Sequence, residues 1–189
     1  MCTYSNIICI TNRHLSDIPF LERIEKIAKK HPKYIVLREK DLSENEYSKL
    51  AKEVMKICDR ENIDLILHSF IDTAISLGVK NIHLPLHIAK EQKSKLKYFE
   101  VIGISTHSME EAVEAENLGA SYITAGHIFE TDCKKGIKGR GLDFIKDILT
   151  NISIPVYGIG GININNMDKV LKCGAEGVCI MSEFMKGNI

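Results

Sequence analysis

The sequence predicts an α/β fold and, within that class, a compact TIM (β/α)8 barrel. Eight short β-branched runs alternate with segments of helical period along the 189 residues. Several of these runs are almost continuously apolar, among them Ile7–Ile10 and Tyr34–Leu37, as is typical of strands buried on both faces of a parallel sheet. Eight such strands alternating with helices predict a closed barrel.

Each expected strand is built on one of these apolar runs and ends where polar residues begin. In a parallel barrel, all of these ends lie at one rim, where the active sites of such barrels form. The expected strands cover Ile7–Thr11, Tyr34–Arg38, Asp64–His68, Asn81–Leu84, Val101–Ser105, Tyr122–Gly126, Pro155–Gly160 and Gly177–Ser182.

Amphipathic segments between the strands predict the helices. Ser108 is placed to cap a helix that has two glutamates in its first turn, and Gly174 is placed to stop another. The connections after the third and fourth strands are short, so their helices must be short too. The other expected helices cover Phe20–Lys30, Glu46–Arg60, Ser108–Leu118, Asn165–Lys172 and Glu183–Lys186.

One domain, residues 1–189, is expected because the length suits a single core and the sequence contains no linker or low-complexity segment. The competing fold is an open doubly wound sheet. A dinucleotide-binding sheet of that kind carries a glycine-rich turn after its first strand, whereas the first strand here runs into Thr11–His14, which contains no glycine. The barrel is therefore preferred.

The charge balance excludes several classes of partner. Lys and Arg number 25, and Asp and Glu also number 25, so the formal net charge is zero. Nucleic-acid binding and docking on acidic membranes both need a basic excess, and no apolar stretch is long enough to span a bilayer. The first residues lack the basic segment of a signal peptide, and the six scattered cysteines are typical of reduced thiols. We therefore expect a cytoplasmic protein that binds neither nucleic acid nor membranes.

Two loops late in the chain indicate a phosphate site. The segment Gly158–Gly161 follows the seventh expected strand, and Met181-Ser182 ends the eighth. Barrel phosphate sites are commonly built from these two loops and a short helix N-terminus, where backbone N–H groups hold the anion and glycine allows close approach. A tight turn followed by an N-cap is the simpler interpretation. The phosphate-binding candidates are Gly160, Gly161, Met181 and Ser182.

Two other strand ends carry candidate chemistry. Arg38-Glu39-Lys40 follows the second strand, where Arg38 could clamp a carboxylate and Lys40 could act as a point charge, unless the run is a solvated loop. His127 follows the sixth strand and is a candidate acid or base, although most isolated histidines are structural or exposed. No pair of carboxylates stands at adjacent strand ends, so no metal site is expected.

Four segments, taken together, resemble a known family. The resemblance is to the thiamine phosphate synthase/TenI superfamily of (β/α)8 barrels, and it covers essentially the whole chain. The segments that carry it are, in order, Val36–Lys40, Gly103–Ser108, Gly126–Gly136 and Gly158–Ile162.

The two main branches of this superfamily imply different chemistry. Thiamine phosphate synthases join a pyrimidine pyrophosphate to a thiazole phosphate with Mg²⁺, which is bound by an aspartate at the end of strand three and by another after strand four. Here these strands end in Leu67–Phe70 and Leu84–His87, so both aspartates are missing. The Gly126–Gly136 segment resembles the TenI branch, whose characterised members are thiazole tautomerases that aromatise a carboxythiazole phosphate without a metal.

The resemblance to TenI implies an isomerase with no cofactor, acting on a small-molecule thiazole phosphate carboxylate. His127 matches the family histidine and could both remove the proton from ring C2 and deliver one to the exocyclic carbon. The other matches are Arg38 and Lys40 in the substrate site, where they could hold the carboxylate; Gly161, Met181 and Ser182 at the phosphate; and Ser105 and Lys134 at pocket positions of the synthase branch.

Two alternatives to the tautomerase stay open at this point. One is a residual thiamine phosphate synthase, and the other is a non-catalytic regulator that binds a thiamine intermediate. The neutral charge and the absence of a helix-turn-helix pattern oppose direct DNA contact by such a regulator. The sequence leaves a homo-oligomer open.

Overall fold

Eight parallel strands form a closed barrel in the computed structural model, in the chain order β1 to β8. The structure describes residues 4–131, 136 and 138–188. The predicted fold class is confirmed, and the predicted strand bounds agree to within one or two residues. The strands are β1 (Ile7–Ile10), β2 (Tyr34–Leu37), β3 (Leu65–His68), β4 (Asn81–Pro85), β5 (Val101–Thr106), β6 (Tyr122–Gly126), β7 (Val156–Ile159) and β8 (Gly177–Ile180).

Helices alternate with these strands, as predicted. None of the helices in the described part of the chain is long and apolar enough to cross a membrane. Helix α6 has no counterpart among the predicted helices, because the side chain of Arg140 before it makes no capping hydrogen bond and the sequence lacks a start signal there. The helices are α1 (Phe20–Ala28), α2 (Glu44–Glu61), α3 (Ile71–Ser76), α4 (Leu86–Glu91), α5 (Met109–Asn117), α6 (Gly141–Asn151), α7 (Met167–Leu171) and α8 (Ser182–Lys186), with 3₁₀ helices η1 (Arg13–Leu15) and η2 (Lys93–Tyr98).

Side-chain caps explain where two of the helices begin. Ser43 Oγ accepts a hydrogen bond from Glu46 N at 3.4 Å, and Glu46 Oε2 accepts one from Ser43 N at 3.0 Å. This capping box starts α2 at Glu44, slightly before the predicted start at Glu46. Ser108 Oγ accepts from Glu111 N at 3.2 Å, so the predicted cap of α5 is confirmed.

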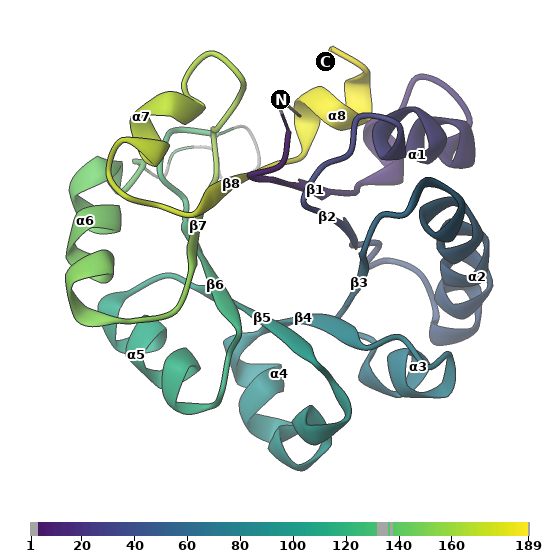
Figure 1. Ribbon diagram of the computed structural model, residues 1–189, viewed down its shortest axis with the longest axis horizontal. Helices are drawn as coiled ribbons and strands as arrows, with labels where there is room; N and C mark the ends of the chain where they lie inside the picture. The colour runs from purple at the N-terminus through teal and green to yellow at the C-terminus, as the bar shows by residue number, and fades with distance from the viewer. Residues whose placement is uncertain (1–3, 132–135, 137, 189) are drawn as a thin grey trace. The chain divides into compact units, whose positions relative to one another are not determined.

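The chain divides into two compact units, of which the first comprises Met1–His83, Lys97–Glu100 and Met181–Ile189. Within this unit β1, β2 and β3 pair in parallel, and α1 and α2 pack side by side (Figure 1). Where β3 pairs with β4, His68 stands opposite His83. The register therefore brings two histidines together that are far apart in the sequence.

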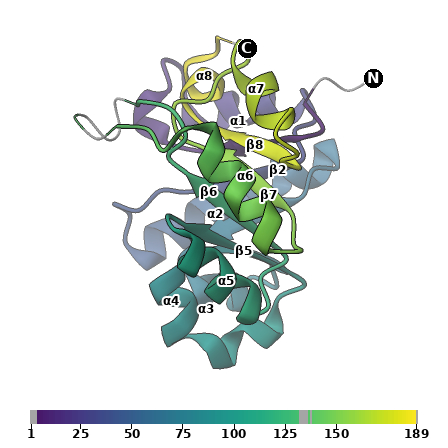
Figure 2. The same cartoon turned by 90° about the vertical axis from the view of Figure 1, so that its left-hand side faces the viewer.

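The second unit comprises Leu84–Leu96 and Val101–Ile180. Its strands β5 to β8 pair in parallel, with Gly126 of β6 opposite Ile159 of β7. Helix α5 packs beside α6, as both Figure 1 and Figure 2 show. Strands β6 and β8 are buried along their whole length, as expected for parallel strands that are covered on both faces.

Tyr47 of α2 joins the ends of β2 and β3. Its side chain is fully buried and stacks on Phe70, with ring centroids 4.0 Å apart. The hydroxyl donates to Leu37 O at 2.6 Å and accepts from His68 N at 3.0 Å. Both partners are backbone groups at strand ends, so one buried hydroxyl ties two strand ends together.

Replacement of Tyr47 by phenylalanine is expected to lower the free energy of unfolding by about 2 kcal/mol, because two buried backbone groups lose their partner while the ring still fills its place. Urea unfolding measures this change. Tyr98→Phe is the control, since that side chain is 51% exposed and its hydroxyl can bind water. Equal effects of the two changes would contradict the prediction.

Candidate functional site

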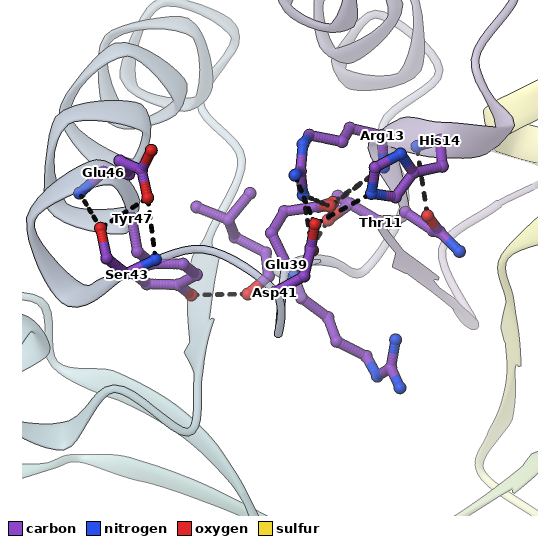
Figure 3. A network of polar contacts seen from close by, with 11 residues as sticks. Thr11, Arg13, His14, Glu39, Asp41, Ser43, Glu46 and Tyr47 are labelled. Carbon is purple, nitrogen blue, oxygen red and sulfur yellow. Dashed lines mark hydrogen bonds and ion pairs between the residues drawn. The ribbon is translucent and has the colours of Figure 1, made fainter.

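In the first unit, a network of charged side chains follows β2 (Figure 3). The Glu39 carboxylate is buried, and it accepts hydrogen bonds from Thr11 Oγ1 at 2.7 Å and from Arg13 N at 3.0 Å. The Arg13 guanidinium lies 3.1 Å from Glu39 Oε2 and also binds Asp41 through both of its Nη atoms. The sequence did not reveal this network, because Thr11 and Arg13 belong to the connection after another strand.

The cations Arg38 and Lys40 alternate with these two acids along the chain. Arg38 N donates to Thr11 Oγ1 at 2.9 Å, so the network also holds the backbone that carries Arg38. Partial burial of its amine and the nearby Arg38 charge lower the pKa of Lys40. Two like charges that raise each other's energy are stabilised when an anion binds to both, which suits the predicted role of this pair.

His68 and His83 form a stacked pair beside these cations. Their ring centroids are 5.6 Å apart, the rings are inclined by 20°, and His68 Nδ1 lies 2.8 Å from Ser69 Oγ. Burial is the main cause that lowers the pKa of both imidazoles, and the Arg38 and Lys40 charges lower it further; for His68, the neighbouring His83 contributes as well. Both rings are therefore neutral at pH 7. His83 is buried within β4.

This group of side chains does not suit a magnesium ion. Mg²⁺ takes oxygen ligands, carboxylates above all, whereas β3 and β4 present two neutral imidazoles beside two cations. The carboxylate of Glu39 already accepts a hydrogen bond from Thr11 and forms an ion pair with Arg13. Within residues 4–131, 136 and 138–188, no group of three or more His, Cys, Asp or Glu side chains is placed to hold a metal ion.

In the second unit, His127 directly follows β6, and its side chain is buried. Backbone hydrogen bonds join the loop that contains it to the loop after β7. Ile128 N donates to Ile159 O at 2.9 Å, and Phe129 N donates to Gly160 O at 3.0 Å. The pairing of β6 and β7 thus continues past the strand ends and fixes the backbone on which His127 stands.

Gly160 and Gly161 pack against this His127 loop. Both have positive φ angles, 95° and 67°, which favour glycine. A Cβ at Gly160 would clash with His127 Cβ, and one at Gly161 would clash with the Glu130 carbonyl. We expected these glycines to let a phosphate approach; the close approach seen in the structure is between two loops. Phosphate binding by their backbone N–H groups stays a prediction.

Gly160→Ala is expected to lower the free energy of unfolding by about 3 kcal/mol, because the new Cβ meets the His127 backbone in addition to the strain of a positive φ. Urea unfolding provides the measurement. Gly119→Ala is a matched control, since Gly119 has φ 89° and no atom lies within 4 Å of the position that a Cβ would take there. In the control, the free energy of unfolding should fall only by the part that backbone strain causes. Equal decreases in the two variants would contradict the prediction, because they would show that the His127 loop moves aside at no cost.

The remaining predicted site residues are dispersed over both units. In the second unit, Ser105 of β5 stands opposite Thr124 of β6, whose Oγ1 donates to Ser105 Oγ at 3.4 Å. In the first unit, Met181 occupies the N-cap position of α8, and Ser182 is the exposed first residue of that helix. Lys134 lies outside the described residues. The ligand-binding roles of these residues stay predictions.

Charged, hydroxyl and histidine side chains gather at the C-terminal strand ends of each unit, while most residues within the strands are apolar. That division defines the class of (β/α)8-barrel enzymes, whose chemistry is carried by the strand ends and the loops that follow them. The family model described as thiamine monophosphate synthase matches residues 7–184. The chain belongs to this TMP-TENI family of thiamine-biosynthesis enzymes, so the predicted superfamily is confirmed.

Individual relatives carry the synthase name. The chain is 35% identical over 179 residues to a thiamine-phosphate synthase of Clostridium acetobutylicum, covering 92% of this chain and 83% of that one. It is 34% identical to a putative thiamine-phosphate synthase 2 of Aquifex aeolicus, covering 95% and 97%. A solved thiamine phosphate pyrophosphorylase of Pyrococcus furiosus is 30% identical with a TM-score of 0.81, covering 96% and 89%. The predicted TenI branch stays a prediction.

Proposed function

We propose that the protein is a thiazole tautomerase that aromatises a carboxythiazole phosphate without a metal. The observation that carries this proposal is the set of side chains at β2, β3 and β4, where Arg38 and Lys40 lie beside the neutral His68 and His83. A synthase needs carboxylates for Mg²⁺ there, and departure of a diphosphate without that ion would lose several kcal/mol of charge stabilisation, of the order that metal ions supply. Proton transfer makes no such demand.

His127 is the proposed acid and base. Its neutral imidazole removes the proton from ring C2, and the resulting imidazolium delivers a proton to the exocyclic carbon. Aromaticity provides the driving force, so the enzyme must chiefly position the base. The hydrogen bonds that join the loops after β6 and β7 support this role, because they fix the His127 backbone.

The other proposed roles concern binding. Arg38 and Lys40 would hold the substrate carboxylate, for which a guanidinium and an ammonium are suited. Backbone N–H groups of the glycine-containing loop and the N-terminal residues of α8 would hold the phosphate. The phosphate-binding residues in this proposal are Gly160, Gly161, Met181 and Ser182, and the pocket residues are Ser105 and Lys134.

A second candidate function is thiamine-phosphate synthesis. The names of the Clostridium acetobutylicum and Aquifex aeolicus relatives favour it over the tautomerase. The side chains at β3 and β4 oppose it, since the candidate requires oxygen ligands for Mg²⁺ that His68 and His83 do not supply. The relatives' names thus favour the synthase, whereas the side chains at β3 and β4 favour the tautomerase, another activity of the same family.

Two parallel assays separate these candidates. In the first, the purified protein receives the non-aromatic carboxythiazole phosphate, and aromatisation is followed by ultraviolet absorbance with and without EDTA. In the second, it receives pyrimidine pyrophosphate, thiazole phosphate and Mg²⁺. EDTA-resistant aromatisation supports the tautomerase, and a rate equal to that of buffer refutes it. EDTA-sensitive condensation supports the synthase, and binding without turnover in either assay indicates the regulator.

A further inference from the structure

The segment that follows β2 places two cations and two acids in strict alternation, Arg38, Glu39, Lys40 and Asp41. In such a run the acids are the closest counter-charges that the cations have along the chain. If these acids formed ion pairs with the two cations, the positive charges would be neutralised and the segment would have little affinity for an anionic ligand. The structure shows a different pairing.

Arg13, from the connection after β1, binds both acids. Its Nη1 lies 3.1 Å from Glu39 Oε2 and 2.7 Å from Asp41 Oδ1, and its Nη2 contacts Asp41 Oδ2 at 2.5 Å (Figure 3). The guanidinium holds the pKa of the Asp41 carboxyl well below its usual range. Arg13 therefore pairs with both carboxylates that flank Lys40, and His14 Nε2 also lies 3.0 Å from Asp41 Oδ2.

Glu39 is more deeply buried than Asp41 and accepts hydrogen bonds from more groups of the connection after β1. It is 2% exposed, and its carboxylate also accepts hydrogen bonds from Thr11 Oγ1 and Arg13 N. A buried carboxylate must have partners, and here the connection after β1 provides them all. Among the described residues, neither Glu39 nor Asp41 forms an ion pair with Arg38 or Lys40.

We propose that Arg13 is a positioning residue that sequesters Glu39 and Asp41 and so keeps Arg38 and Lys40 available to an anionic group of the substrate. This inference rests on the proposed function for the role of Arg38 and Lys40 as substrate ligands. Without Arg13, Asp41 would keep only its contact with His14, and the buried Glu39 would lack a cation. The cations on their own segment, Arg38 and Lys40, are the nearest along the chain. The anion site would then be occupied by the protein's own carboxylates.

Calorimetric titration with inorganic pyrophosphate in the absence of divalent metal tests the inference on the intact protein. Arg13→Gln should weaken binding about tenfold, within the range measured for coupled charges. Adding Glu39→Gln and Asp41→Asn to that variant should restore the affinity to within about threefold of wild type, because the competing charges are gone. A purely structural role of Arg13 predicts no such recovery.

Arg60→Gln is the matched control. Arg60 is exposed on α2 and likewise pairs with two carboxylates, those of Glu25 and Glu61, so the change removes the same charge and the same kind of contact elsewhere in the unit. Its pyrophosphate affinity should equal that of wild type. Failure of Arg13→Gln to weaken binding, loss of affinity in the control to the same extent, or absence of recovery in the triple variant would each overturn the inference.

A second variant keeps the test valid if Arg13→Gln does not fold, which circular dichroism shows. Glu39→Gln with Asp41→Asn, in the presence of Arg13, should bind pyrophosphate at least as tightly as wild type, and weaker binding overturns the inference. The titration involves no turnover. The predicted binding pattern without aromatisation would therefore refute the proposed function and leave the inference intact, and aromatisation without the pattern would do the reverse.

Discussion

Exchange of His127 for glutamine is expected to lower kcat for aromatisation of the carboxythiazole phosphate by about 100- to 10,000-fold, the range that a lost general acid–base group accounts for. Glutamine can still form hydrogen bonds but cannot take up a proton and return it. The loss should appear in kcat more than in KM, because the group acts on the reacting atoms. Initial rates at saturating substrate measure it.

The control for this variant is His107→Gln in the same unit. His107 follows β5, is exposed, and pairs with Glu111 on the protein surface. Its replacement should leave kcat unchanged. If His127→Gln keeps kcat within about threefold of wild type, a loss of less than 1 kcal/mol in transition-state stabilisation, then His127 is not the group that transfers the proton.

A second large effect is expected on stability in acid, where the protein should lose stability steeply below about pH 6.5. In the unfolded chain, His68 and His83 titrate near that pH; in the folded protein, burial lowers the pKa of both well below it. Between the two pKa values the unfolded state binds more protons than the folded state. The free energy of unfolding therefore decreases by about 1.4 kcal/mol for each histidine and each unit by which the pH is lowered. Above pH 6.5 neither state binds these protons, and below the folded pKa the loss is complete.

Urea unfolding at pH 7.5 and at pH 5.5 checks this expectation. A variant with His68→Asn and His83→Asn should lose most of the pH dependence, whatever its stability at neutral pH. His87→Asn is the control, because His87 is exposed and its substitution should leave the slope as it is. A double variant with the wild-type slope would place the acid sensitivity in other groups.

The local patterns in the sequence were sufficient for the barrel and for the positions of its strand ends. Strands buried on both faces need continuous apolar runs, and such runs can be recognised from the sequence alone, as in Ile7–Ile10 and Gly177–Ile180. Helix α6 was missed because its start lacks a capping side chain, whereas Ser108 indicated the start of α5. Caps and apolar periods are local, and that is why they can be predicted.

The site was predicted residue by residue but not as an arrangement. Arg38 and Lys40 could be picked out by charge, yet the pairing of Glu39 with Arg13 spans 26 positions and depends on which connections lie side by side. The stacking of His68 on His83 likewise depends on the β3–β4 register, which no local pattern fixes. Contacts of this kind follow from tertiary structure, and a sequence pattern gives no measure of them.

The hydrogen bonds between the loops after β6 and β7 also bear on how such a site can be moved to another scaffold. A graft of the His127 loop alone would leave Ile128 N and Phe129 N without their acceptors. It would also meet a Cβ wherever the recipient lacks glycine at the position of Gly160. The smallest unit that can be grafted is thus the pair of loops after β6 and β7, and both must be moved to the new scaffold together.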